Sequence, residues 1–284
     1  MELYRIFRPI TAHPFICSEE YAEWEPCEAL KPYIRCFWGT AKPVMKHNTG
    51  PGMQDIVTPD TCADIIFEMD FTNNKLHGVF CGIDDRTFYA NSGSEEEKLV
   101  FTFAIRFYAW TAVLFSEDSM RDTRHAFFDV ECHFSRIKRE LEPLLYEAQT
   151  MAAMIGAAEK VLLKAFCKNR ENHLVSEAVG TVLLSKGTMR AEQLAREMHM
   201  SERQLQRLFK EYVGISPKTV ASLVRYQYLW QDILYNPYFH ILDAVHRYGY
   251  TDQAHLLHDF KKFHAMNVKE ARDYARQNVA FLQD

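Results

Sequence analysis

The sequence of 284 residues contains no hydrophobic run that approaches the ~20 residues needed for a membrane-spanning helix. Its first ten residues, MELYRIFRPI, carry charges where a signal peptide has its apolar core, so we expect a cytoplasmic protein with no membrane partner. Low-complexity tracts and repeats of the solenoid type are also lacking. The composition is 48% hydrophobic and 25% charged, which is typical of a globular protein with a sizeable core. The length favours two domains.

Motifs of the common enzyme classes are missing as well. The sequence has no phosphate loop, no glycine-rich dinucleotide fingerprint and no evident Ser/His/Asp arrangement for nucleophilic catalysis. The spacings of its histidines and cysteines match no zinc template. We therefore expect no enzyme, no catalytic residue, no cofactor and no metal site.

Seven cysteines are present, and none forms a C-x-x-C pair. Their number is odd in a chain without an export signal, so reduced and mostly buried thiols are the main expectation. A thiol- or metal-responsive role stays open as the alternative. The cysteines are Cys17, Cys27, Cys36, Cys62, Cys81, Cys132 and Cys167.

The first half of the chain is rich in short segments typical of β-strands. Turn-forming residues separate DIIFEMDF (64–71), HGVFCGI (77–83) and LVFTFAIRFYAW (99–110). In the last segment, apolar side chains at alternate positions flank Thr102 and Arg106, a period of two that indicates a half-buried strand. Several such strands without a βαβ rhythm predict an antiparallel barrel or sandwich.

From about Phe134 onward, apolar residues recur every three or four positions, which indicates helices. We expect Pro143 in a bend or in a first turn. These helices either pack on the sheet or form a dimer interface, and the sequence favours neither. A break at 168–173 predicts an α+β domain over 1–170 and an all-α domain over 171–284.

Charge singles out no strongly basic domain. Residues 1–170 contain 19 Lys and Arg against 25 Asp and Glu, and residues 171–284 contain 14 against 13. A DNA-binding surface would therefore depend on the local placement of charge.

The segment TMRAEQLAREMHMSERQLQRLFKEYVG (188–214) has the pattern of a helix-turn-helix unit, over about 190–212. Leu194 and the small Ala195 should be buried, because the two helices of such a unit cross closely. Ser201, with Gln204 three residues later, forms a capping-box pattern at the start of the second helix. Arg and Gln side chains remain on its outer face, and these residue types read base edges in the major groove.

The segment FHILDAVHRYGYTDQAHLLHDFKKF (239–263) repeats the pattern, over about 240–263. Gly249 predicts the turn, because glycine adopts the left-handed backbone of a tight corner, and Thr251 or Asp252 can cap the second helix. Between the units, residues 216–235 can form one helix of roughly 25–30 Å. Such a spacer could hold two recognition helices about one duplex turn apart.

This pattern resembles the AraC/XylS family, whose DNA-binding domain is two helix-turn-helix units joined by a long helix. The run GYTDQAHLLHDFKKF resembles one branch of it, and ALKPYIRCFWG (29–39), PDTCADIIFEM (59–69) and FAIRF (103–107) resemble that branch's uncharacterised N-terminal β-rich domain. Further matches in the C-terminal half are Leu194-Ala195, Ser201, Leu205, Arg207 to Lys210, Gly214, Ser216-Pro217, Arg225, Gly249-Tyr250 and Phe260 to Lys262.

Departures from the family concern the second unit. Ala265 to Val268 replaces the usual Gly-x-Ser/Thr-Pro, His258 stands where relatives have Arg, and Asp232 where they have Leu. We expect the first unit to read bases and the second mainly to contact phosphates. The expected DNA-binding residues are Ser201, Arg203, Gln204, Gln206, Arg207, Lys210, Thr251, Gln253, His255, His258, Lys261 and Lys262.

The resemblance implies a regulator of promoter DNA whose upstream domain binds a small effector or dimerises, with RNA polymerase as a possible partner. Aromatic residues and charges embedded in apolar strands suggest an effector site, although a barrel core with solvent-facing charges explains each of them slightly better. The candidates are Trp38, Phe67, Glu68, Arg106 and Trp110. Besides the thiol- or metal-responsive regulator, a pure interaction protein with degenerate DNA units is the other alternative.

Overall fold

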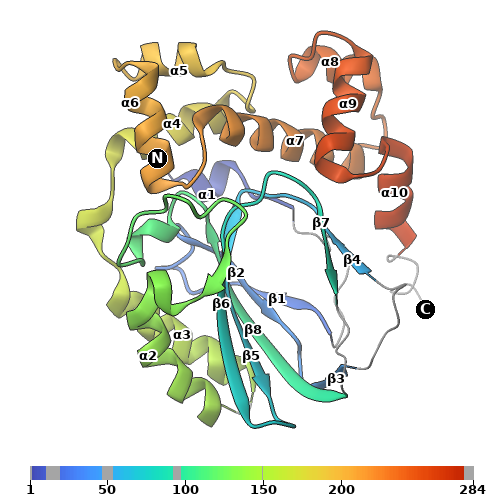
Figure 1. Cartoon of the computed structure of the whole chain (residues 1–284). Coiled ribbons are helices and arrows are strands. Elements are labelled where there is room, and N and C mark those ends of the chain that lie inside the picture. Colours follow the sequence, from blue (N-terminus) through green and yellow to red (C-terminus); the bar gives the residue numbers. More distant parts are fainter. Residues whose placement is uncertain (1, 11–19, 47–53, 92–96, 149, 278–284) are drawn as a thin grey trace.

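Strands and helices occupy different parts of the chain in the computed structural model, which describes residues 2–10, 20–46, 54–91, 97–148 and 150–277 (Figure 1). Apart from helix α1 (Leu3–Ile6) and a 3₁₀ turn at Ala112–Leu114, the described residues before 130 form strands and loops. Helices follow from Glu131 on. In Figure 1, the helices of the last third form a layer across one end of the sheet.

Seven antiparallel strands form the main sheet, in the order β1-β2-β8-β5-β6-β9, with β3 paired to the start of β8. Strands β4 and β7 form a separate pair. This antiparallel sheet with accompanying helices confirms the fold class expected for the first half. The strands are β1 (Ala22–Trp24), β2 (Ile34–Gly39), β3 (Val44–Lys46), β4 (Gln54–Val57), β5 (Cys62–Asp70), β6 (Lys75–Cys81), β7 (Phe88–Asn91), β8 (Lys98–Tyr108) and β9 (Phe127–Asp129).

The two faces of the sheet follow the alternation of the sequence. Along β8, every second residue from Phe101 to Phe107 is almost completely buried and packs against α2 (Glu131–Glu147) and α3 (Met151–Ala165). Thr102 and Arg106 face the other way. The strand predicted from the period of two is therefore confirmed, and its apolar face forms the core beneath α2 and α3.

Pro143 is expected in a bend or in the first turn of a helix, and this prediction is wrong. Pro143 lies well inside α2, while the chain departs from helical geometry at Phe134, where φ is −134° and ψ is 43°. Proline in a helix interior removes one backbone donor and clashes with the carbonyl four residues earlier, which costs about 3 kcal/mol or more. Helix α2 buries Ile137, Leu141 and Leu145 against the sheet, and this packing keeps it continuous through the proline.

In the last third of the chain, two short helix pairs, α5–α6 and α8–α9, lie at opposite ends of one long helix, α7, and α4 and α10 accompany them (Figure 1). This arrangement confirms the all-α domain of two helix-turn-helix units joined by a long helix. The helices are α4 (His173–Leu184), α5 (Ala191–Glu197), α6 (Glu202–Tyr212), α7 (Pro217–Tyr235), α8 (Ile241–Arg247), α9 (Gln253–His264) and α10 (Val268–Gln277).

The two halves of the chain share an apolar core. Phe7 and Ile10, which follow α1, and Trp110, which follows β8, are buried together with residues of α4 to α9. Gly214, at the end of α6, has a φ of +87°, and a β-carbon there would stand 2.4 Å from Thr123 Oγ1. Glycine is required at this close approach. The sheet half therefore lies directly against the helices that carry the two units.

Candidate nucleic-acid interface and the polar face of the sheet

The first helix-turn-helix unit, α5 and α6, has the local structure that its sequence predicts. Ala195 and Leu205 are about 2% and 1% exposed, so the two helices meet closely over the small side chain. Ser201 Oγ accepts a hydrogen bond from Gln204 N (3.3 Å), and Gln204 Oε1 accepts one from Ser201 N (3.0 Å). This capping box satisfies donors at the start of α6 and fixes where the helix begins.

The outer face of α6 carries the residues expected to bind DNA. All six residues expected to bind DNA in this unit are exposed, because Leu205 and Phe209 occupy the inner face. They are Ser201, Arg203, Gln204, Gln206, Arg207 and Lys210. Gln204 is a special case, since its Oε1 is engaged by both the Ser201 amide and the Ser201 hydroxyl (2.9 Å). Its side chain therefore stabilises the helix start. Of the other residues expected to bind DNA in α6, Arg203, Gln206, Arg207 and Lys210 are exposed.

The second unit, α8 and α9, begins its outer helix on Asp252, whose Oδ1 accepts a hydrogen bond from His255 N (2.8 Å). Gly249 provides the turn with a φ of +65°. All six residues expected to contact DNA here are exposed: Thr251, Gln253, His255, His258, Lys261 and Lys262. The His255 ring packs edge-on against the Tyr250 ring, with 5.3 Å between ring centroids.

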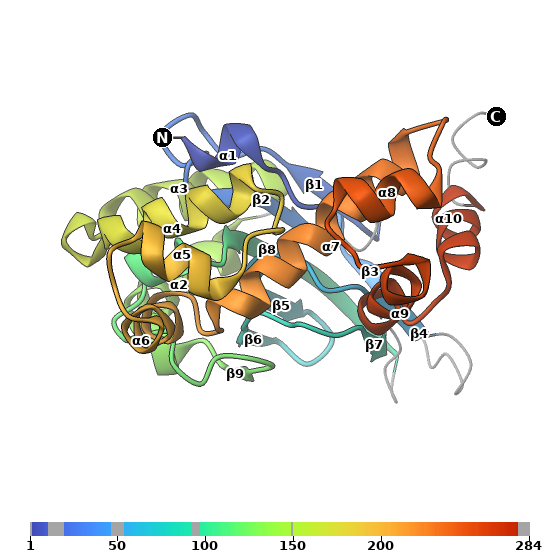
Figure 2. The same cartoon turned by 90° about the horizontal axis from the view of Figure 1, so that it is seen from above.

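The two outer helices are held parallel to each other. In Figure 2, α6 and α9 are both seen end on, and both lie on the same side of α7. Helix α7 has 19 residues and is therefore about 28 Å long. That length is close to the roughly 34 Å between successive major-groove segments on one face of a duplex.

Two ion pairs that the sequence pattern did not reveal hold the second unit on α7. Arg225 Nη2 lies 2.8 Å from Asp259 Oδ2, and the Arg225 guanidinium lies 4.3 Å from the centre of the Tyr250 ring. Arg247 Nη1 lies 2.7 Å from Asp232 Oδ2. Asp232, which departs from the family pattern, thus forms part of the joint between α7 and α8.

The five effector candidates do not come together. Trp38 and Arg106 lie on the sheet face that points away from α2 and α3, and so does Glu68, which pairs with Thr102 in the register. We call this the polar face. Phe67 is fully buried on the opposite face, opposite Phe103.

Trp110 is separated from the polar face as well. It stacks on Tyr108, with 5.4 Å between ring centroids, inside the core shared with the helices. An aromatic residue after a strand fits any apolar core, so the sequence could not assign Trp110 to one face.

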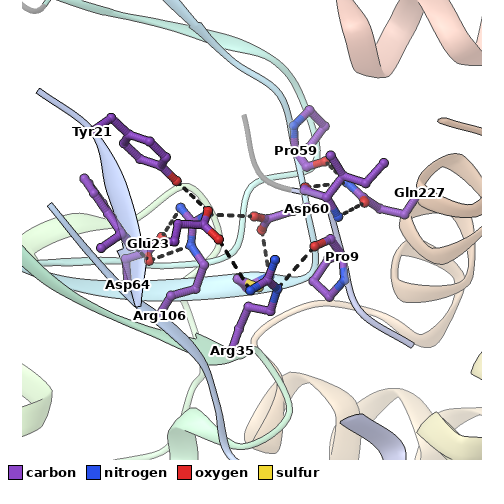
Figure 3. A network of polar contacts seen from close by, with 12 residues as sticks. Pro9, Tyr21, Glu23, Arg35, Pro59, Asp60, Asp64, Arg106 and Gln227 are labelled. Atoms are coloured by element: carbon purple, nitrogen blue, oxygen red, sulfur yellow. Dashed lines mark hydrogen bonds and ion pairs between the residues drawn. The ribbon is translucent and has the colours of Figure 1, made fainter. Parts of the chain in front are cut away.

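The polar face carries a buried charge network around Arg106 (Figure 3). Asp64 accepts hydrogen bonds from Arg106 Nε (2.8 Å) and Nη2 (3.1 Å), and the Trp38 Nε1 group donates to the same carboxylate (2.9 Å). Asp60 Oδ2 lies 3.7 Å from Arg106 Nη1, and burial raises the pKa of Asp60 to about 6. Glu68, at the far end of the face, pairs with Lys46 (2.5 Å).

A second arginine, Arg35 on β2, extends this network toward the helices. Its Nη1 lies 3.5 Å from Glu23 Oε2, and its Nε donates to the Pro9 carbonyl oxygen (3.3 Å). The Nη1 atoms of Arg35 and Arg106 are buried and make no hydrogen bond. Sequence reasoning missed Arg35, Asp60 and Asp64, because only the strand register shows which charges meet.

The described cysteines are all free, and Cys17 lies outside the described residues. Burial raises the pKa of the Cys36 thiol to about 12 and also raises the pKa of Cys62 and of Cys81. The thiolate is the reactive form, so these three thiols are poorly suited to redox sensing near neutral pH. Among the described residues no cluster of His, Cys, Asp and Glu has the arrangement of a metal site.

Two family models each match a separate segment of the chain. Residues 194–274 match the family model of a helix-turn-helix domain, and residues 22–129 match a domain of unknown function (DUF6597). A search of curated proteins found no significant match. None of the helices within the described ranges is long and apolar enough to cross a membrane.

Solved structures with some similarity to this chain include two of ToxT from Vibrio cholerae. The one bound to an unsaturated fatty acid superimposes with a TM-score of 0.40 at 10% identity, over 83% of this chain and 94% of that chain. The other, a structure at 1.65 Å resolution, gives a TM-score of 0.40 at 11% identity, over 82% of this chain and 96% of that chain.

Proposed function

The chain carries an AraC-type helix-turn-helix domain behind a DUF6597 domain, and on this premise we propose that it is a sequence-specific transcription regulator of promoter DNA. The observation that carries the proposal is the placement of α6 and α9. They are parallel and lie on one side of α7 (Figure 2). They also expose Arg, Gln, Lys and His side chains. Two recognition helices so placed can enter successive major-groove segments on one face of the duplex.

The two units contribute differently in this proposal. The first presents Arg203 and Arg207 on the outer face of a well-capped helix, and arginine reads guanine edges bidentately. The second presents Lys261 and Lys262 near the end of α9, and lysine is a point charge suited to phosphate. We therefore assign base reading mainly to α6 and phosphate contacts mainly to α9. Ser201 and Gln204 hold the start of α6 in place.

Binding to the promoter next to the protein's own gene tests this assignment. Fluorescence anisotropy should show steeply salt-dependent binding of the wild type, with a preference over random DNA. The double variant Arg203→Ala/Arg207→Ala should lose this preference, because each bidentate base contact contributes about 1–3 kcal/mol of discrimination.

A matched control removes two positive charges elsewhere. Arg139 on α2 and Lys160 on α3 are exposed and lie outside the helix-turn-helix units. The variant Arg139→Ala/Lys160→Ala should therefore keep the preference for promoter DNA. A retained preference in the α6 double variant would show that α6 is not the reading helix.

The N-terminal half is proposed to bind a small effector on the polar face. Trp38 and Arg106 meet there, with the Arg106 guanidinium 5.6 Å from the Trp38 ring centre, and Glu68 lies farther along the same face. Phe67 and Trp110 are no longer part of the proposal, since both are sealed in apolar cores. Native mass spectrometry of the purified protein should reveal a bound small molecule, and the variant Ile66→Trp, which fills this face, should lose it. The same bound mass in both proteins would place the ligand elsewhere.

We also propose that the protein forms a homodimer and contacts RNA polymerase, as expected for a regulator of this type. Helices α2 and α3 leave Leu144, Tyr146 and Leu163 exposed, and such side chains fit either a dimer contact or simple surface exposure. Sedimentation of the purified protein distinguishes a homodimer from a monomer.

A further inference from the structure

Helix α7, which joins the two helix-turn-helix units, carries a polar side chain that is completely buried. Gln227 lies in the middle of α7 with 0% exposure, at a position where an amphipathic helix would carry an apolar residue. Its amide makes three hydrogen bonds, all to backbone groups of the sheet half. A buried amide of this kind loses stability when it is left without its hydrogen-bond partners.

The partners of Gln227 belong to two separate segments (Figure 3). Its Oε1 accepts from Ile10 N (2.8 Å), and its Nε2 donates to Pro59 O (3.0 Å) and to Ile10 O (3.4 Å). Ile10 lies in the segment that follows α1, and Pro59 lies in the loop between β4 and β5. The side-chain amide of Gln227 thus binds both segments to α7, the helix between the two helix-turn-helix units.

Each of these segments is also bound to an arginine on the sheet. Pro59 precedes Asp60, whose carboxylate accepts from Cys62 N (2.7 Å) and forms the ion pair with Arg106. Pro9 precedes Ile10, and its carbonyl accepts from Arg35 Nε. Two short routes therefore lead from the charge network to the same side chain, one through Asp60 and Pro59 and one through Pro9 and Ile10.

The two carboxylates, Asp64 and Asp60, do not hold Arg106 equally tightly. Arg106 is bound tightly by Asp64 but only loosely by Asp60, since the Nη1 atom that approaches Asp60 makes no hydrogen bond. The contact with Asp60 is therefore the weaker of the two that Arg106 makes with carboxylates. Arg106 is the central charge of the polar face, so a group bound there acts directly on this loose contact.

We infer that Gln227 is the positioning residue through which the charge network of the polar face sets the placement of α7, and with it the placement of α6 and α9 on DNA. The inference rests on the proposed DNA binding. It assigns to Gln227 a role that differs from simple packing, because the effect of a change at Asp60 must pass through its amide.

A double-mutant cycle tests this dependence, since it measures whether two sites act together. The variant Asp60→Asn keeps an acceptor for Cys62 N but loses the ion pair with Arg106. The variant Gln227→Met keeps the side-chain volume but loses all three hydrogen bonds. Asp60→Asn should change the affinity for promoter DNA by about fivefold or more in the wild-type background, as expected for a coupling between sites.

In the Gln227→Met background the same Asp60→Asn change should alter the affinity by less than about twofold. The control Tyr228→Phe removes a different contact between α7 and the sheet half, the bond from Tyr228 Oη to Ile6 O, and should leave the effect of Asp60→Asn intact. Equal effects of Asp60→Asn in both backgrounds would overturn the inference, and so would an absence of any effect in the wild-type background.

Hydrogen exchange supplies a readout that requires no DNA. In Arg106→Lys, which keeps the charge but loses the paired hydrogen bonds to Asp64, the amide of Ile10 should exchange about fivefold faster than in the wild type. In Gln227→Met this amide should exchange fast whether or not Arg106 is changed. An Ile10 amide unaffected by Arg106→Lys would contradict the inference. Failure of the wild type to prefer promoter DNA would instead contradict the proposed function and leave this second test standing.

Discussion

His264 is a titratable side chain enclosed between two helices of the DNA-binding half. It is 4% exposed, its Nδ1 lies 2.8 Å from Tyr226 Oη, and its ring stacks on Phe260 with 5.0 Å between centroids. Burial lowers the pKa of His264 to about 4. The folded protein therefore favours the neutral imidazole, whereas an unfolded histidine takes up a proton below about pH 6.5.

The sign of the pH dependence follows from these two values. The free energy of unfolding should fall as pH drops from about 6.5 toward 4, by up to about 3 kcal/mol from this residue alone. Urea unfolding at several pH values measures the effect. In His264→Gln this part of the slope should vanish, whereas His258→Gln, a change at an exposed histidine of the same helix, should retain it. An unchanged slope in His264→Gln would assign the acid sensitivity to other groups.

At the scale of elements, the local sequence pattern was sufficient to predict a helix or strand when one side of that element faces the core and the other faces solvent. The alternation in 99–110 predicted β8, and the capping box at Ser201 with the inward Leu205 and Phe209 predicted α6. The spacer expected over 216–235 is α7. Each of these predictions needed only residues close together in the sequence.

Contacts between distant segments could not be predicted in this way. Gln227 is buried by partners at Ile10 and Pro59, which are 217 and 168 positions away along the chain. A glutamine in a helix is usually exposed, so the sequence alone places it in solvent. The same limit explains Asp60 and Asp64, whose meeting with Arg106 depends on strand register and on a loop that the pattern does not specify.

At the scale of the whole molecule, hydrogen bonds join the two halves at several places along the DNA-binding domain. The end of α6 is fixed by the hydrogen bond from Met120 N to Glu211 O (2.8 Å), the middle of α7 by Gln227, and the end of α9 by the hydrogen bond from Thr87 Oγ1 to Phe263 O. Together with α7, these contacts set where α6 and α9 stand relative to each other. The spacing of α6 and α9 is therefore a property of the whole fold.

Hydroxyl-radical footprinting of the wild-type protein on its own promoter tests this spacing most directly. The account predicts two protected segments on one face of the duplex, with their centres one helical turn, about 10–10.5 base pairs, apart. A single protected segment, or two segments on opposite faces of the DNA, would contradict the claim that α6 and α9 bind successive turns together.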